Sequence, residues 1–176
     1  VIEETFSQMK IPYYIENGLN FYQRSEVKYL LDYLRLINDP DSEEGDEALK
    51  SIINVPNRYI SRKFVQELVE FSNKTNVHLF EGLKSIPVDL PYIRKNVKDF
   101  VSFISPLADY SSNLEPSEVI QMIRSQMDYD RFITDEDIPT PDDVKIANLN
   151  QLQLSAARYS GIQDFLNYTD SFSEQM

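Results

Sequence analysis

The sequence KIPYYIENGLNFYQRSEVKYLLDYLRLI, at residues 10–37, decides the fold class of this chain. From residue 26 to about residue 38 its apolar side chains recur at helical spacing, and Ser25 is placed to cap that helix. The apolar face consists of Val27, Leu30, Leu31, Leu34 and Ile37. Residues 13–15 can form one short strand before Gly18. The stretch therefore predicts a short strand and turn that lead into a strongly amphipathic helix.

The rest of the chain continues the helical pattern. Pro106 is expected to kink or end one predicted helix, and Ser61 is expected to cap another. We expect helices near residues 1–9, 47–54, 62–73, 79–85, 91–107, 115–127, 142–159 and 162–169. The sequence thus predicts an all-α fold, a single compact domain of about seven to nine helices. It would contain a helix-hairpin-helix-like element and at most one short strand near the N-terminus.

Composition limits the class of protein. With 176 residues and 41% hydrophobic content, the chain can bury one core. It contains no cysteine, which excludes disulfides and thiolate metal sites and fits our expectation of a cytoplasmic protein. No apolar run is long enough to span a bilayer and no signal peptide is evident, so we expect no membrane partner. Because the first residue is Val1 rather than Met, we expect the chain to be part of a longer protein.

The formal charge of −12 argues at first against nucleic-acid binding, because phosphate neutralisation needs Lys and Arg. The acids are concentrated, however. Residues 39–47 hold six acids and no base, and residues 128–143 hold seven acids and one base, which leaves 16 acids and 16 bases elsewhere. Residues 56–98 carry eight bases and four acids. The acidity therefore lies in two predicted loops, and a local phosphate contact remains compatible with the low pI.

No catalytic, cofactor-binding or metal-binding residue is predicted in this chain. It has one histidine, His78, and no Gly-rich phosphate loop of the Walker type. Because His78 lies between two predicted helices, a structural or surface role is expected for it. Neither acidic run has the Asp-x-Asp-x-Asp-Gly spacing of a calcium loop, so solvated loops are expected there.

The segment VPNRYISRK, at residues 55–63, is the one with a binding mechanism. It joins two predicted helices by a tight connection, and the backbone N–H groups that begin the second helix suit a phosphate. The candidate DNA-binding residues are Arg58, Tyr59, Ile60, Ser61, Arg62 and Lys63. Such a contact would position a duplex without reading its sequence. The residues alone fit equally well an ordinary turn whose basic side chains face water.

Three blocks of sequence resemble domain 2B of the UvrD/Rep/PcrA-type superfamily 1 DNA helicases. The first block contains Ile11-Pro12-Tyr13, Gly18-Leu19, Phe21-Tyr22, Arg24, Glu26, Val27-Lys28 and Tyr33-Leu34-Arg35-Leu36-Ile37. The second contains Ile53-Asn54-Val55-Pro56 and Arg58, and the third contains Asn148-Leu149, Leu152 and Phe165-Leu166. The resemblance implies that residues 1–9 end a motor-domain (2A) segment and that residues 10–176 form a 2B-like accessory domain.

The resemblance also implies a function within a larger enzyme. The parent would bind ATP and Mg²⁺ between two RecA-like motor domains and move along single-stranded DNA, typically 3′ to 5′, in repair or replication. The 2B-like domain would not hydrolyse ATP itself. It would modulate unwinding and contact duplex or junction DNA weakly and non-specifically, with the motor domains and possible proteins as further partners.

One departure from the family bears on this contact. Members commonly have Gly-Ile-Gly after the hairpin arginine, where this chain has Tyr59-Ile60-Ser61. Because glycine permits close backbone approach, the grip on a phosphate is expected to be weaker or differently built here. An alternative is an acidic helical module whose segments 39–47 and 128–143 dock a motor domain or repair partner. An independent enzyme is disfavoured, because no catalytic constellation is present.

Overall fold

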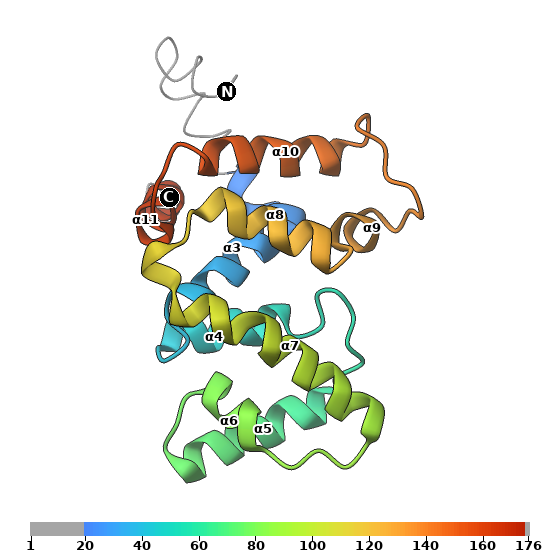
Figure 1. The fold of residues 1–176 in the computed structure, drawn as a ribbon, viewed down its shortest axis with the longest axis vertical. Helices are drawn as coiled ribbons and strands as arrows, with labels where there is room; N and C mark the ends of the chain where they lie inside the picture. Colours follow the sequence, from blue (N-terminus) through green and yellow to red (C-terminus); the bar gives the residue numbers. More distant parts are fainter. Residues whose placement is uncertain (1–19, 175–176) are drawn as a thin grey trace. The chain divides into compact units, whose positions relative to one another are not determined.

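A computed structural model describes residues 20–174 of the chain. Within that range it contains nine complete α-helices (α3 to α11), a further helical segment at residues 20–23 and one short 3-10 helix, with no strand (Figure 1). This confirms the all-α prediction. The helix expected at residues 1–9 and the strand expected at residues 13–15 lie outside the described residues. None of the described helices is long and apolar enough to cross a membrane.

The helices group into two compact units. One contains residues 20–31 and 114–174 of the described chain, and the other contains Asp32–Asn113. The division falls inside α3 (Ser25–Asn38), the helix predicted from the opening stretch. Its predicted apolar face is buried completely or almost completely, which explains why this stretch has the strongest helical pattern.

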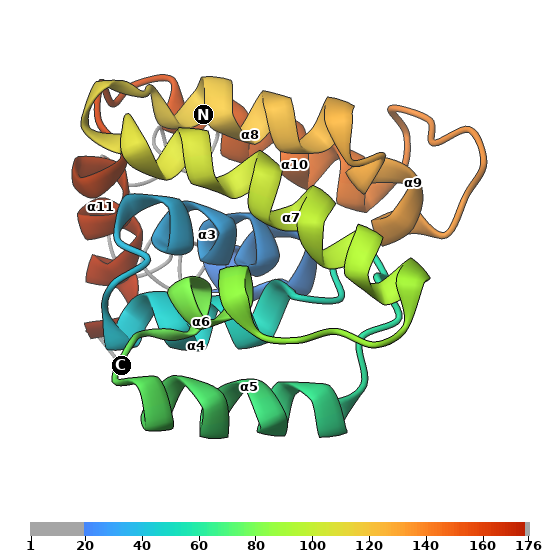
Figure 2. The ribbon, with the colours of Figure 1, turned by 60° about the horizontal axis from the view of Figure 1, so that its bottom comes forward.

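The Asp32–Asn113 unit contains four helices besides the end of α3. These are α4 (Glu43–Ile52), α5 (Arg62–Thr75), α6 (Leu79–Ser85) and α7 (Pro91–Asp109), followed by the 3-10 helix η1 (Ser111–Asn113). The short helix α6 packs against α4, α5 and α7, and α5 lies along one edge of the unit (Figure 2). The two helices that flank the predicted hairpin, α4 and α5, are therefore held together by a third helix.

A close contact seats α5 on α6. A Cβ atom on Gly82 would lie 2.3 Å from the Ser72 hydroxyl oxygen, a distance that no pair of such atoms tolerates. That hydroxyl is buried and has no hydrogen-bond partner among the described residues. Glycine thus allows the close approach of these two helices without any movement of the Ser72 hydroxyl, and it does not serve an unusual backbone conformation.

Helices α4 and α7 differ from their predicted boundaries. Helix α4 begins at Glu43, so half of the expected acidic loop 39–47 is helical. The Gly45 N–H donates to the Ser42 hydroxyl at 3.0 Å, and the acids of the first turn complement the helix dipole. Helix α7 continues past Pro106 to Asp109. Because this proline lies in the last turn, its ring removes one backbone hydrogen bond near the helix end.

The other unit contains the first part of α3 and four further helices. These are α8 (Pro116–Gln126), α9 (Tyr129–Thr134), α10 (Val144–Ala156) and α11 (Ile162–Glu174). Helix α10 packs along α8, and α9 contacts both (Figure 1). Helix α9 was not predicted, because it is short and lies within the acidic segment 128–143 that was expected to be a loop. Helix α11 extends beyond the predicted end at residue 169.

Candidate functional site

The connection between α4 and α5 is an ordered turn. The Asn54 side chain bridges it, since its Nδ2 donates to the Ile60 carbonyl at 2.7 Å and its Oδ1 accepts from the Ile60 N–H at 3.0 Å. Ser61 caps α5 as predicted, and its hydroxyl accepts from the Phe64 N–H at 3.0 Å. Ile60 is buried, so it anchors the turn and cannot reach a ligand with its side chain.

Arg58 points into the unit. Its guanidinium donates to the carbonyl oxygens of Ile52 at 2.9 Å and Ile53 at 3.0 Å, which lie at the end of α4. It also donates to the Tyr33 hydroxyl at 2.7 Å and lies 4.4 Å from the centroid of the Phe100 ring. The side chain that was expected to contact DNA therefore satisfies carbonyl groups that end a helix and stabilises the turn from within.

Tyr33 completes this internal cluster. Its hydroxyl donates to the Val55 carbonyl oxygen while it accepts from Arg58. Burial raises the pKa of the Tyr33 hydroxyl, and the nearby Arg58 charge partly opposes that rise. The hydroxyl thus stays protonated and continues to donate at neutral pH.

Tyr59 has the backbone conformation that glycine favours. Its φ is 61°, and its N–H donates to the Asn57 side-chain oxygen at 2.9 Å. The left-handed conformation places a Cβ close to the following carbonyl oxygen, at a cost of about 1–2 kcal/mol for residues other than glycine. The ring is 68% exposed, so its own packing recovers little of that cost. The structure thus explains why glycine would suit this position, and it shows the bulk of Tyr59 directed away from the core.

Arg62 and Lys63 are the exposed cations of the predicted set. Both lie in the first turn of α5, where no acid is present. Neither forms a hydrogen bond or ion pair within residues 20–174. Positive charge at a helix N-terminus is unfavourable for the helix itself, so these side chains do not serve its stability. They remain available to an anion.

A groove lies beside this turn, with a volume of about 290 Å³. The structure brings Tyr59, Ser61 and Lys63 of the predicted set to its wall, whereas Arg58 and Ile60 lie inside the unit. The opposite wall includes Leu90 and Tyr92, which sequence reasoning missed. Apolar side chains on both sides of Pro91, at a helix start, were the available signal.

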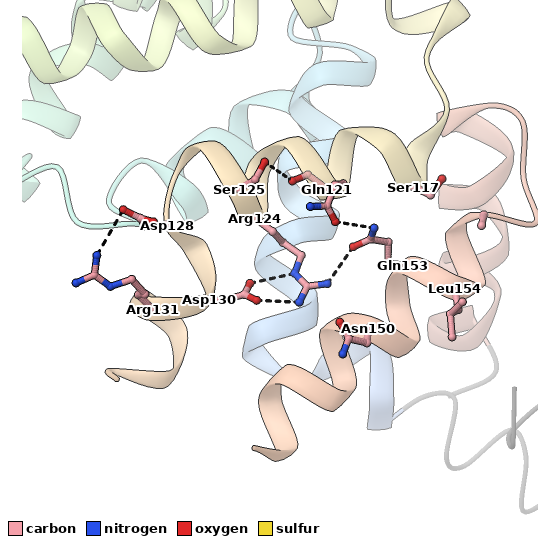
Figure 3. A pocket seen from close by; sticks show the side chains of 11 residues that line it. Ser117, Gln121, Arg124, Ser125, Asp128, Asp130, Arg131, Asn150, Gln153 and Leu154 are labelled. Atoms are coloured by element: carbon pink, nitrogen blue, oxygen red, sulfur yellow. Dashed lines mark hydrogen bonds and ion pairs between the residues drawn. The ribbon is translucent and has the colours of Figure 1, made fainter. Parts of the chain in front are cut away.

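A second and larger groove, of about 640 Å³, lies between α8, α9 and α10 (Figure 3). The polar side chains that line it form hydrogen bonds with one another. Arg124 binds both carboxylate oxygens of Asp130, at 3.0 and 2.8 Å, and donates to Gln153 at 2.9 Å. Gln153 donates in turn to Gln121 at 2.8 Å. Since these polar groups satisfy one another, the network has a structural role in holding α8, α9 and α10 together.

His78 also has a structural partner. Its Nδ1 lies 2.8 Å from an Asp46 carboxylate oxygen, and the other oxygen of Asp46 accepts from the Leu79 N–H at 2.9 Å. The hydrogen bond that the Asp46 carboxylate accepts raises the pKa of the His78 imidazole. Asp46, from the acidic run 39–47, thus connects α4 to the start of α6. Among the described residues, no group of three or more His, Asp or Glu side chains is arranged to hold a metal ion.

Comparison with known proteins shows the family. The sequence model of the UvrD-like helicase C-terminal domain matches residues 1–174. The ATP-dependent DNA helicase PcrA of Staphylococcus epidermidis is 30% identical over 154 residues, which cover 86% of this chain and 20% of that protein. PcrA of Staphylococcus aureus is 28% identical over 178 residues, covering 99% of this chain and 22% of the relative.

A further relative is the ATP-dependent DNA helicase Rep of Buchnera aphidicola. It is 29% identical over 136 residues, which cover 76% of this chain and 21% of the relative. This chain spans about a fifth of the length of the curated relatives it matches. The match to the family model covers both compact units of the structure. The chain therefore belongs to the family of UvrD-like helicase C-terminal domains.

Proposed function

We propose that this chain is a non-catalytic, 2B-type accessory domain of an ATP-dependent DNA helicase. Its α4–α5 turn contacts the backbone of duplex or junction DNA and thereby modulates unwinding. The relatives named as ATP-dependent DNA helicases support the parentage. The observation that carries the DNA contact is the pair of exposed cations, Arg62 and Lys63, at the start of α5 without an ion pair within residues 20–174.

In this proposal the basic side chains of the turn have two roles, one structural and one in binding. Arg58 fixes the turn from within, and Arg62 and Lys63 meet the phosphates, aided by the N–H groups at the start of α5. Two phosphate contacts predict weak binding and a slope of log K against log salt of about −1.8. ATP and Mg²⁺ are bound and used elsewhere in the whole protein, which we propose acts in the cytoplasm.

A binding titration tests the contact. The double variant Arg62→Ala/Lys63→Ala is expected to bind a labelled duplex much more weakly than the wild-type chain does. Fluorescence anisotropy at salt concentrations from about 50 to 200 mM measures both affinities. The control Lys74→Ala/Lys98→Ala removes the same charge from exposed positions on α5 and α7. Equal losses in the two variants would assign the binding to net charge and would remove the turn from the proposal.

A second candidate function is protein docking. It is favoured by the segment between α9 and α10, where Ile138 is 82% exposed and follows three consecutive acids, Asp135 to Asp137. Such a surface suits a basic partner with an apolar pocket, for example a motor domain of the parent. Neutralising the three acids is expected to weaken capture of the motor domains and to leave duplex binding unchanged, which separates the two functions.

A further inference from the structure

We infer that the groove beside Tyr59 binds one unpaired nucleotide where a duplex ends. The inference rests on the proposed DNA contact, and it adds a second ligand group to it, a nucleobase. The groove is formed by three segments that are separated in the sequence, namely the α4–α5 turn, the start of α5, and the loop that leads into α7. The side chains used in the argument are Tyr59, Lys63, Glu67, Asp89, Leu90 and Tyr92.

Both walls of the groove are fixed by side chains of α7. The Arg94 guanidinium donates to the Val88 carbonyl oxygen at 3.0 and 2.9 Å, which holds the loop before α7. The Asn96 side chain donates to the Arg58 carbonyl oxygen at 3.1 Å, which holds the turn on the other side. Because one helix clamps both walls, a ligand does not have to order them on binding, and preorganisation of this kind favours affinity.

The groove displays large apolar side chains to solvent. Tyr59, Tyr92 and Leu90 are 68%, 57% and 53% exposed. Exposed aromatic rings beside a cation are the usual platform for unpaired bases, because every base has a face that can stack on them. Tyr59 also keeps its ring here at the cost of a left-handed backbone, and strained residues of this kind concentrate at functional sites.

The polar groups match the two parts of a nucleotide. Lys63 offers a positive charge to a phosphate, and Arg62 lies next to it in the first turn of α5. Glu67 and Asp89 offer carboxylate oxygens, which accept hydrogen bonds from the exocyclic amino groups of bases. The volume of 290 Å³ equals that of about ten water molecules, similar to the number of heavy atoms in a base. A nucleotide uses the cation, the rings and the carboxylates together, whereas an apolar peptide uses only the rings.

Three DNA ligands test the inference with the full chain. These are a forked duplex, the same fork with an abasic first unpaired position, and a blunt duplex. In the Tyr92→Ala variant, affinity for the fork is expected to fall roughly tenfold while affinity for the blunt duplex stays unchanged. The Tyr59→Gly variant should also lose affinity for the fork relative to the blunt duplex. The Tyr59→Phe variant keeps the ring and should bind the fork normally. Tyr110→Ala is the matched control, because Tyr110 is 65% exposed and lies outside the groove.

The outcomes separate this inference from the proposed function. If the wild-type chain binds the abasic fork as tightly as the intact fork, no base enters the groove and the inference is overturned. Unchanged Tyr59 and Tyr92 NMR signals at saturation with the fork would leave the groove to a peptide and would overturn it too. If only the groove fails, Arg62→Ala/Lys63→Ala still weakens binding of the blunt duplex. If the proposed contact itself fails, that double variant binds both DNAs like the wild type.

Discussion

The Glu26 carboxylate accepts a hydrogen bond from the Asn148 side-chain amide at 2.8 Å, although 122 residues separate the two. The carbonyl oxygen of Glu26 also accepts from the Tyr129 hydroxyl at 2.6 Å. Glu26 is only 4% exposed, and both partners are contributed by the C-terminal part of the chain. The start of α3 is thus connected to α9 and α10 by polar contacts within one unit. Two blocks that carry the resemblance to domain 2B, at opposite ends of the chain, meet at this hydrogen bond.

Replacing Asn148 tests that connection. The Asn148→Leu variant leaves a buried carboxylate without this hydrogen bond, which is expected to lower the free energy of unfolding by about 2 kcal/mol. Asn150→Leu is the control, because Asn150 is exposed on the same helix. Urea unfolding followed by circular dichroism measures both variants. Similar stability of the two would show that the Glu26 contact contributes little.

We expect substitution of Arg58 to lower the stability of the fold, whereas substitution of Arg62 should have little effect on it. The Arg58→Met variant removes the donors to Ile52 and Ile53 and is expected to lower the free energy of unfolding by about 3 kcal/mol. Arg58→Lys should not restore it, because an ammonium group cannot reproduce the planar fork of donors. For Arg62→Met, an exposed change, we expect less than about 0.5 kcal/mol. A stable, fully folded Arg58→Met variant would contradict the inward orientation of this side chain.

The Tyr59→Gly variant is expected to be more stable than the wild-type chain, although it lacks the ring that we propose binds a base. Glycine adopts the φ of 61° without a steric penalty, so the free energy of unfolding should rise by about 0.5–1 kcal/mol after the greater entropy loss of glycine is included. Tyr59→Ala removes the same ring but keeps the penalty, so it should not be stabilised. Thermal unfolding of both variants is the measurement. A gain in Tyr59→Ala as large as in Tyr59→Gly would point to removal of the exposed ring as the cause.

The His78–Asp46 pair predicts a dependence of stability on pH. The pKa of the folded-state imidazole is raised by its hydrogen bond to Asp46, so the pair stabilises the fold fully below the unfolded pKa of about 6.5. This contribution is lost as the pH rises through the folded-state pKa. Because the chain has one histidine, a single imidazole NMR signal reports the pKa directly. In Asp46→Asn the pKa should fall towards its ordinary value, and an unchanged pKa would exclude Asp46 as the cause.

The features that could be predicted from the sequence are those that depend on residues close together in the chain. Helix α6 was predicted with its observed bounds, because its apolar pattern and flanking residues are local signals. The start of α4 was misjudged, because its acids indicated a loop when they in fact complement a capped helix end. The orientation of Arg58 depends on Tyr33, 25 positions earlier, and on Phe100. No pattern within the turn itself distinguishes this arginine from Arg62.

The groove beside Tyr59 could not be predicted from the sequence, because residues far apart in the chain form it. Tyr59 and Tyr92 belong to segments that only the fold brings together, and neither segment has a motif that points to the other. The turn was predicted as a DNA contact because Arg58, Arg62 and Lys63 have no acid among them, although the whole chain is acidic. The charge of this segment, and not the charge of the whole chain, led to that prediction.

The contact between Gly82 and Ser72 has a consequence for evolution of the chain. Helix α5 carries Arg62 and Lys63 at one end, and a methyl group on residue 82 of its neighbour α6 would lie 2.3 Å from the Ser72 hydroxyl oxygen. Alanine at position 82 can be accommodated if the Ser72 hydroxyl, which has no hydrogen-bond partner among the described residues, rotates away, whereas a larger side chain would press against α5. A position on α6 thus limits where the cations of α5 can lie, and side chains larger than alanine should be poorly tolerated there.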